Sequence, residues 1–266
     1  MDIGIEPRRV YAMVLRYWFY LRHSYDRLSD MFYWPMIDLL LWGLTSQYMR
    51  TQAQGQSEHI MLMVISGLLF WIVVWRAQYE ITVNFLSEIW DKNLVNIFVS
   101  PLRFNEWLLA VYVVGISKMS ISFTFASLMA FLLYKVNVLA YGWYAPVFSI
   151  ILMIMGWAVG MLVASVILRF GTKAQTLAWC AVMVVSPFSA IFYPLTILPD
   201  WAQQVSRAVP ASYVFENARR LVLTGSVNWS ELGVALVLSL VYFSLAFRLI
   251  SHSFAKAKER GLIKVY

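Results

Sequence analysis

Long apolar segments separated by short polar ones dominate this chain of 266 residues. Six of the apolar segments approach or exceed the roughly 20 residues that a helix needs to cross a bilayer. Each is predicted to be helical, because lipid cannot satisfy the backbone groups of open structures. The predicted spans are residues 31–49, 60–83, 108–134, 145–168, 176–193 and 232–250. The pattern predicts an all-α integral membrane protein with a single transmembrane domain over residues 1–266.

The segment before the first predicted span, residues 7–30, has a helical pattern of a different kind. Its apolar residues fall on one helical face, and its arginines lie mostly on the others. The apolar face comprises Val10, Met13, Val14, Tyr17 and Leu21. Because Pro7 suits the first turn of a helix, we expect a basic amphipathic helix on the inner membrane surface. It is either a simple lipid anchor or a lever that another subunit touches.

The net charge of +7 could indicate a nucleic-acid partner, but the placement of the cations favours a topological explanation. If the N-terminus is cytoplasmic, the inner segments hold 14 Lys and Arg residues and the outer segments hold 5. This difference follows the positive-inside rule and predicts that both termini are cytoplasmic. We therefore expect membrane lipids, and no nucleic acid, as partners.

The residue types that catalytic and metal sites need are scarce. The chain is 61% hydrophobic and only 13% charged, and no GxxxxGK[ST] phosphate cradle or Gly-rich dinucleotide motif occurs. His23, His59 and His252 are far apart, and Cys180 is the single cysteine, so neither a metal cluster nor an intrachain disulfide is predicted. These absences argue against a self-contained enzyme. A carrier, a channel, or a membrane subunit driven by a partner remains.

Two short helices are predicted between the fifth and sixth spans, in residues 194–225. The first begins at Asp200 and ends at Pro210, and the second begins near Ser212 and ends at Gly225. Neither can cross a core of about 30 Å, so we expect a re-entrant hairpin from the outer side. The alternative is a helical pair lying flat on the outer surface.

This hairpin is predicted to close the outer mouth of a path through the protein. The candidate outer-gate residues are Pro194, Pro199, Trp201, Tyr213, Glu216 and Arg220. Glu216 and Arg220 stand four residues apart and are expected to form an ion pair. Glu216 has either a role at the cargo exit or a structural role as the partner of an arginine.

Charges inside the predicted spans are costly in lipid, so they should be paired or face a cavity. They are Asp38, Arg76, Glu80 and Lys118. A structural pair, Asp38–Arg76 or Arg76–Glu80, is the favoured interpretation. Contact between Lys118 and a transported molecule is the alternative.

Two further patterns concern the later spans. Gly156, Gly160 and Ala164 share a spacing that allows the fourth span to pack closely on another helix. Ser186 and Pro187 are predicted to kink the fifth span.

Two motifs resemble a known family. "FYPLTILPDWAQQVSRAVPASYVFENARRLVLTG" contains an aromatic-Pro pair, a second proline before a tryptophan, and a Pro-x-Ser-Tyr step that leads to an acidic and basic helix. "NLVNIFVSPLRFNEWLLA" contains a Ser-Pro-Leu turn followed by an acidic residue. Together with six spans, these features resemble the permease subunits of type-2 ABC exporters over nearly the whole chain.

The resemblance implies a dimer of permease chains, a second copy of this chain being the simplest partner, in the inner membrane of a bacterium. Two separate ATP-binding cassette subunits would carry ATP and Mg²⁺, with no cofactor on this chain. The coupling region would be residues 86–102. Its candidate contact residues are Glu88, Asp91, Lys92, Leu94, Phe98 and Pro101.

The same resemblance leaves the cargo open between a glycan, a lipid-linked glycan and an amphiphilic small molecule. Several aromatic residues lie deep in the predicted spans and suit either sugar rings or greasy rings. They are Trp42, Phe70, Trp71, Trp75, Trp157 and Trp179. A channel or a structural membrane subunit without an ATPase partner is the alternative function.

Overall fold

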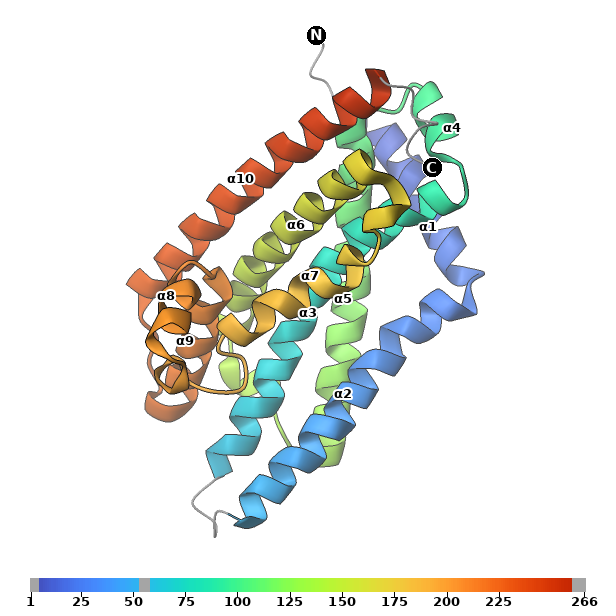
Figure 1. Cartoon of the computed structure of the whole chain (residues 1–266). Helices are drawn as coiled ribbons and strands as arrows, with labels where there is room; N and C mark the ends of the chain where they lie inside the picture. Colours follow the sequence, from blue (N-terminus) through green and yellow to red (C-terminus); the bar gives the residue numbers. More distant parts are fainter. Residues whose placement is uncertain (1–4, 53–57, 260–266) are drawn as a thin grey trace.

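The computed structural model describes residues 5–52 and 58–259, and every regular element in those residues is a helix (Figure 1). The long helices are α2 (Tyr25–Gln52), α3 (Glu58–Trp90), α5 (Phe104–Tyr134), α6 (Tyr144–Phe170) and α10 (Trp229–Glu259). The short ones are α1 (Pro7–Arg22), α4 (Leu94–Val99), α7 (Leu177–Val185), α8 (Asp200–Arg207) and α9 (Pro210–Thr224). Single 3₁₀ turns are η1 (Val138–Tyr141), η2 (Gly171–Ala174), η3 (Ser186–Phe188) and η4 (Leu195–Ile197). The all-α prediction is confirmed.

Within the described residues, four helices are long and apolar enough to cross a membrane. They are Met61–Trp90, Phe104–Tyr134, Tyr144–Ala174 and Trp229–Glu259, which contain most or all of the second, third, fourth and sixth predicted spans. The first predicted span lies in α2, whose first half carries three aspartates, Asp26, Asp30 and Asp38, so its composition is more polar. The count of six spans stays a prediction.

The predicted fifth span, residues 176–193, is not one helix. Its α-helical part, α7, ends at Val185, and the 3₁₀ turn η3 follows with Pro187 in it. Because proline has no backbone N–H, it cannot continue the α-helical hydrogen bonding. The Ser186 hydroxyl instead donates to the Met183 carbonyl oxygen at 3.0 Å. The proline therefore stops the α-helix here, where only a kink was expected.

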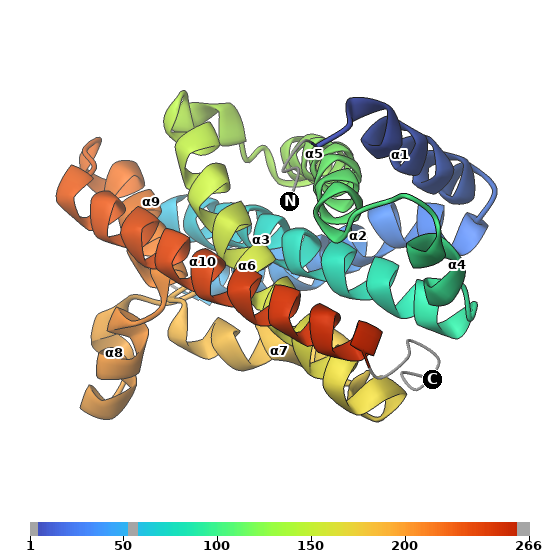
Figure 2. The same cartoon turned by 90° about the horizontal axis from the view of Figure 1, so that it is seen from above.

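Helix α3 lies at the centre of the molecule. Helices α2, α5, α6 and α7 all pack against it, and α10 packs along α6. Figure 2 shows α5 and α7 on opposite sides of α3. Apolar side chains of α3 such as Ile65, Leu69, Phe70, Ile81 and Phe85 are fully buried.

Close packing of α6 on α3 depends on two glycines. A Cβ at Gly156 would lie 2.7 Å from the Val74 carbonyl oxygen and from Ala77 Cβ, and one at Gly160 would lie 2.9 Å from the Gln78 carbonyl oxygen. The expectation that this glycine pattern allows close approach is confirmed, and the structure identifies α3 as the partner helix.

Helix α1 has the predicted apolar stripe but is shorter than predicted. Val10, Met13, Tyr17 and Leu21 are buried, while Val14 is only partly buried. The helix ends at Arg22, where the His23 N–H bonds back to the Phe19 carbonyl oxygen, so residues 25–30 belong to α2. The stripe covers the first turns of α5 and the last turns of α3. The position of α1 on a membrane surface stays a prediction.

Replacing Gly156 with Ala should lower the thermal stability of the protein. Alanine favours a helix by up to about 1 kcal/mol over glycine, but overpacking against the α3 backbone costs about 1–3 kcal/mol. Gly233→Ala in α10 is the matched control, because a Cβ there meets nothing within 4 Å. Thermal unfolding of both variants in detergent measures the difference. Equal melting temperatures would contradict the close α3–α6 contact.

Candidate functional site

Helix α3 carries a row of buried polar side chains through the apolar interior. The row comprises Arg76, Gln78, Glu80, Thr82, Asn84, Ser87 and Glu88. Positions 76, 80, 84 and 88 are four residues apart and therefore share one face of the helix. This face points at α1, α2 and α5, which supply the partners described below.

Arg76 forms a buried ion pair with the first turns of α2. Its Nη1 lies 2.8 Å from Asp30 Oδ2, and its Nη2 also donates to the Asp30 carbonyl oxygen. Arg76 is 1% exposed, so the pair neutralises a charge that lipid would penalise strongly. The predicted partners, Asp38 and Glu80, are both wrong. Asp30 lies one residue before the predicted first span, but α2 begins at Tyr25 and includes it, which brings Asp30 beside Arg76.

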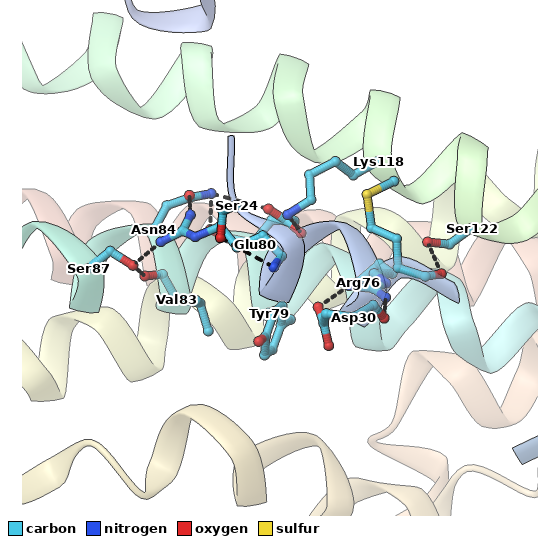
Figure 3. Close-up of polar contacts among 12 residues, drawn as sticks. Ser24, Asp30, Arg76, Tyr79, Glu80, Val83, Asn84, Ser87, Lys118 and Ser122 are labelled. Carbon is cyan, nitrogen blue, oxygen red and sulfur yellow. Dashed lines mark hydrogen bonds and ion pairs between the residues drawn. The ribbon is translucent and has the colours of Figure 1, made fainter. Parts of the chain in front are cut away.

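Lys118 of α5 is the partner of Glu80. The Lys118 Nζ to Glu80 Oε1 distance is 2.5 Å, and Asn84 Nδ2 donates to Glu80 Oε2 at 3.2 Å. Figure 3 shows Lys118 reaching from α5 to Glu80, with the Arg76–Asp30 pair one turn further along α3. The ion pair favours a structural role for Lys118 over the alternative, a contact with a transported molecule.

The end of the row around Asn84 and Glu88 connects α1 and α2 to α3. Arg27 donates to Asn84 Oδ1 at 3.3 Å and to Ser87 Oγ at 2.5 Å. Glu88 accepts from Arg16 at 2.8 Å and from Tyr17 at 3.0 Å. Burial, together with the neighbouring Glu88 charge, raises the pKa of Tyr17 well above its usual value. The Tyr17 hydroxyl therefore stays protonated and donates to Glu88 at physiological pH.

The predicted coupling region, residues 86–102, contains both buried and exposed candidates. Glu88 and Leu94 are buried, so neither can touch another subunit directly. Phe98 is partly buried and its ring packs on that of Phe254, with centroids 4.5 Å apart. Asp91, Lys92 and Pro101 are exposed, as is the apolar side chain of Val99, at 79%. The apolar face of α4 therefore points inward, so Leu94 is not available as the contact residue that was predicted.

A surface groove of about 400 Å³ lies between α1 and this coupling region. Its lining includes Arg9, Met13, Arg16, Asn96, Ile97 and Pro101. Arg9 Nη1 donates to the Pro101 carbonyl oxygen at 2.7 Å, and Arg16 reaches Glu88. The groove therefore joins an exposed surface to the buried polar row of α3.

The predicted hairpin is present as α8 and α9, with different ion pairs from those expected. Glu216 pairs with Arg219 at 2.8 Å and accepts from the Leu195 N–H at 2.8 Å. Arg220 pairs with Glu231 of α10 instead, at 3.1 Å. The Glu216–Arg220 prediction is wrong because Arg220 points to α10. These contacts favour the structural role for Glu216.

The other outer-gate candidates hold the hairpin together. Pro194 and Pro199 precede η4 and α8, and Tyr213 donates to the Arg207 carbonyl oxygen at 2.9 Å. Trp201 is 63% exposed. The second helix begins at Pro210, earlier than predicted, since the Ser212 hydroxyl bonds the Ser206 and Val209 carbonyl oxygens instead of capping α9. Re-entry of this hairpin into a membrane stays a prediction.

Two neighbouring cavities follow α3 between α2 and α7. The first, of about 360 Å³, is lined mainly by polar residues and includes Arg27, Glu80, Asn84 and Lys118. The second, of about 420 Å³, is lined mainly by aromatic side chains. Both include Asp30, Tyr79 and Trp179, so they adjoin each other, and we refer to the two together as the cleft.

The aromatic cavity gathers most of the deep tryptophans that the sequence indicated. It is lined by Trp34, Asp38, Trp42, Trp71, Trp75, Tyr79 and Trp179, among others. Their convergence was not predicted from the sequence. A signal was present in the equal spacing of Trp71, Trp75 and Tyr79, which places three rings on one face of α3. Among the described residues, no group of His, Cys, Asp or Glu side chains could hold a metal ion.

The Lys118–Glu80 pair should behave as one energetic unit. Lys118→Met or Glu80→Gln alone should destabilise the protein by about 3–5 kcal/mol, because each leaves a buried charge unpaired. The double variant should recover most of that loss. Thermal unfolding measures all three, with Lys173→Met on the exposed turn η2 as the control. A Lys118→Met protein of normal stability that no longer transports would instead support a direct cargo contact.

Comparison with known proteins gives a family for this geometry. No curated protein matches the chain. A family model described as "ABC-2 type transporter" matches residues 17–223, which include α2 to α9 and most of the coupling groove. The chain therefore belongs to the ABC-2 type transporter family, as a membrane-embedded permease.

Proposed function

We propose that this chain is the membrane-spanning subunit of an ATP-driven exporter. Two copies form the path, and separate ATP-binding subunits drive it from the cytoplasmic side. One observation carries the proposal: the exposed groove between α1 and α4 connects, through Arg16, Tyr17 and Glu88, to the helix that lines the cleft.

The groove has the features of a docking surface for an ATP-binding subunit. Pro101 lines the groove and is exposed. Val99, Asp91 and Lys92 lie outside its lining but are exposed on the same coupling region, where they offer one more apolar contact and two charges. A movement of α4 would reach α3 over a short route, since three residues separate the two helices and Asn93 also donates to Glu88 at 2.9 Å. ATP and Mg²⁺ would reside on the partner, with none on this chain.

The cleft along α3 is the proposed path. It opens between α2 and α7, which pack on α3 from different sides. Both helices also present large exposed apolar side chains, among them Leu41 and Leu44 on α2 and Met183 and Val184 on α7. A second copy against these faces would enclose the cleft, so we propose a homodimer in which α2 and α7 flank the shared path. The short helices α8 and α9 would dip in from the outer side and close its mouth.

The topology follows from the same proposal. The chain crosses the inner membrane of a bacterium six times, with α2 as the most polar crossing and the segment of α7 and η3 as the shortest. Both termini are cytoplasmic, as the distribution of Lys and Arg favours.

Val99→Asp should separate docking from folding. The variant should lose most of its bound ATP-binding subunit, at least tenfold in a pull-down with the subunit encoded by a neighbouring gene, because it places a charge on an exposed apolar contact. Leu139→Asp is the matched control, since Leu139 is 86% exposed on η1, at the opposite end of α5 from the groove. Unchanged binding by Val99→Asp would move the docking surface elsewhere. A wild-type chain that binds no ATPase would favour a channel or a structural subunit.

Cysteine labelling tests the proposed orientation. In a Cys180→Ser background, cysteines replacing the exposed residues Leu139 and Ser226 should react with an impermeant thiol reagent from outside the cell. A cysteine replacing the exposed Lys173 should react only after the membrane is opened. The opposite labelling pattern would invert the topology.

A further inference from the structure

We propose that the aromatic cavity is a binding site for a bulky organic cation, with Asp38 as its counter-ion and the surrounding tryptophans as its walls. The site deepens the proposed function, because it assigns the cargo to amphiphilic cations. It rests on that function only for the statement that the bound cation is cargo. The binding site itself consists of residues of one chain.

Two helices present matching rows of side chains to the cavity. On α2, Trp34, Asp38 and Trp42 are four residues apart, and on α3, Trp71, Trp75 and Tyr79 have the same spacing. Spacing of four residues places each row on one helical face. Asp38 therefore stands between two tryptophans on its own helix and lies across the cavity from three aromatic rings.

Several of these rings are held by aromatic neighbours. The Trp42 ring stacks on that of Phe192 with centroids 4.0 Å apart, and the Trp75 ring stacks on that of Tyr79 at 6.2 Å. Trp179 closes the cavity from α7 and stacks on Trp90 at 6.3 Å. Rings fixed in this way give a ligand preformed faces, which lowers the ordering cost of binding.

Asp38 is the group that decides the charge of the ligand. Within residues 5–52 and 58–259 it has no ion-pair or hydrogen-bond partner. The other charged groups of the cavity, Asp30 and Arg76, neutralise each other at 2.8 Å, and α7 contributes no charged side chain to the lining. The cavity therefore has one uncompensated negative charge, on a side chain that is exposed in the single chain and lies within the first predicted span, where a carboxylate needs a partner.

An organic cation satisfies both features of the cavity at once. Its charge pairs with Asp38, and its apolar groups lie on aromatic faces that attract cations. The cavity disfavours an anion: Arg76 keeps one unpaired donor, Nε, but its charge is neutralised by Asp30, and Asp38 leaves the lining with a net negative charge. A neutral glycan could stack on the rings but would leave Asp38 unpaired. A volume of about 420 Å³ is within the range of about 300–1,000 Å³ typical of small-molecule sites.

The neighbouring polar cavity provides a suitable entrance. In its lining Glu80 is paired with Lys118, and Asp30 is neutralised by Arg76, which leaves two carboxylates, Asp26 and Asp91, against one basic group, Arg27. This excess of acidic groups contrasts with the net charge of +7 for the whole chain. A cation approaching from the cytoplasmic side therefore passes a locally acidic region before it reaches the tryptophans.

The test uses two probes of the same shape and opposite charge, tetraphenylphosphonium and tetraphenylborate. Equilibrium dialysis with the purified full chain in neutral detergent, without any ATPase, should show saturable binding of the phosphonium and at least tenfold weaker binding of the borate. Asp38→Asn should weaken phosphonium binding at least tenfold, and Asp38→Glu should largely restore it. The control Asp200→Asn makes the same chemical change on the exposed first turn of α8 and should bind normally.

A second variant and a stability measurement keep the outcome clear. Trp75→Ala should weaken phosphonium binding, and each variant must keep the wild-type melting temperature for its binding to count. If Asp38→Asn is too unstable for its binding to be compared, binding is followed in the wild-type chain instead. The phosphonium should protect Trp75 from a fluorescence quencher, and the Trp75 signal is the difference between wild type and Trp75→Phe.

Three results would overturn the proposal. They are equal binding by wild type and Asp38→Asn, equal binding of the two probes, and binding of maltohexaose in place of the phosphonium. A wild-type chain that binds the phosphonium but no ATP-binding subunit would refute the exporter and leave the cation site standing. Retention of that subunit without phosphonium binding would leave an exporter with a different cargo.

Discussion

A charge buried in a membrane protein must have a partner, and this constraint determines how three helices are placed around α3. Arg76 fixes the start of α2 through Asp30, Glu80 fixes the middle of α5 through Lys118, and Glu88 fixes α1 through Arg16. Each pair lies on one face of α3, at intervals of one helical turn or two. Apolar packing alone would tolerate sliding of these helices, whereas an unpaired buried charge costs about 3–5 kcal/mol.

The row of ion pairs lies on the side of α3 that packs against α1, α2 and α5, whereas the cleft lies between α2 and α7. Helix α2 is held in its second turn by Asp30, and just past its midpoint Gly43 lies against the Tyr134 ring while Trp42 stacks on Phe192. Between these two attachments α2 bridges a cleft instead of filling it, and Asp38 lies in that stretch. Between these contacts Leu39 packs into the core while Asp38, the residue before it, is exposed and lines the cavity, so this carboxylate remains without a partner.

The sequence predicted the elements better than it predicted their contacts. The long apolar runs, the stripe of α1, the prolines of the hairpin and the Gly225 terminus of α9 follow from local chemistry, and each is present. The partners of Arg76 and Arg220 could not be predicted, because they depend on how helices distant in the chain lie beside each other. The inward direction of Leu94 had the same cause: a six-residue helix has an apolar face, but only the position of α1 and α5 decides where that face points. The convergence of the tryptophans likewise required α2, α3 and α7 to meet.

The glycine contact between α3 and α6 has a mechanical consequence. With Gly156 and Gly160 seated on the α3 backbone, α6 can shift along α3 only by disengaging from it, and the next equivalent seat is one helical turn away, about 5.4 Å. Small displacements cannot be absorbed there, so α3 and α6 would translate and tilt together as one rod. In contrast, the interior of α7 is joined to α3 by a hydrogen bond from Gln78 Nε2 to the Ala178 carbonyl oxygen, at 3.0 Å, and by the buried Ala178 and Val182. A movement of α4 would therefore displace α3 and α6 together. The width of the cleft would change at α7, which packs less extensively on α3 than α2 does.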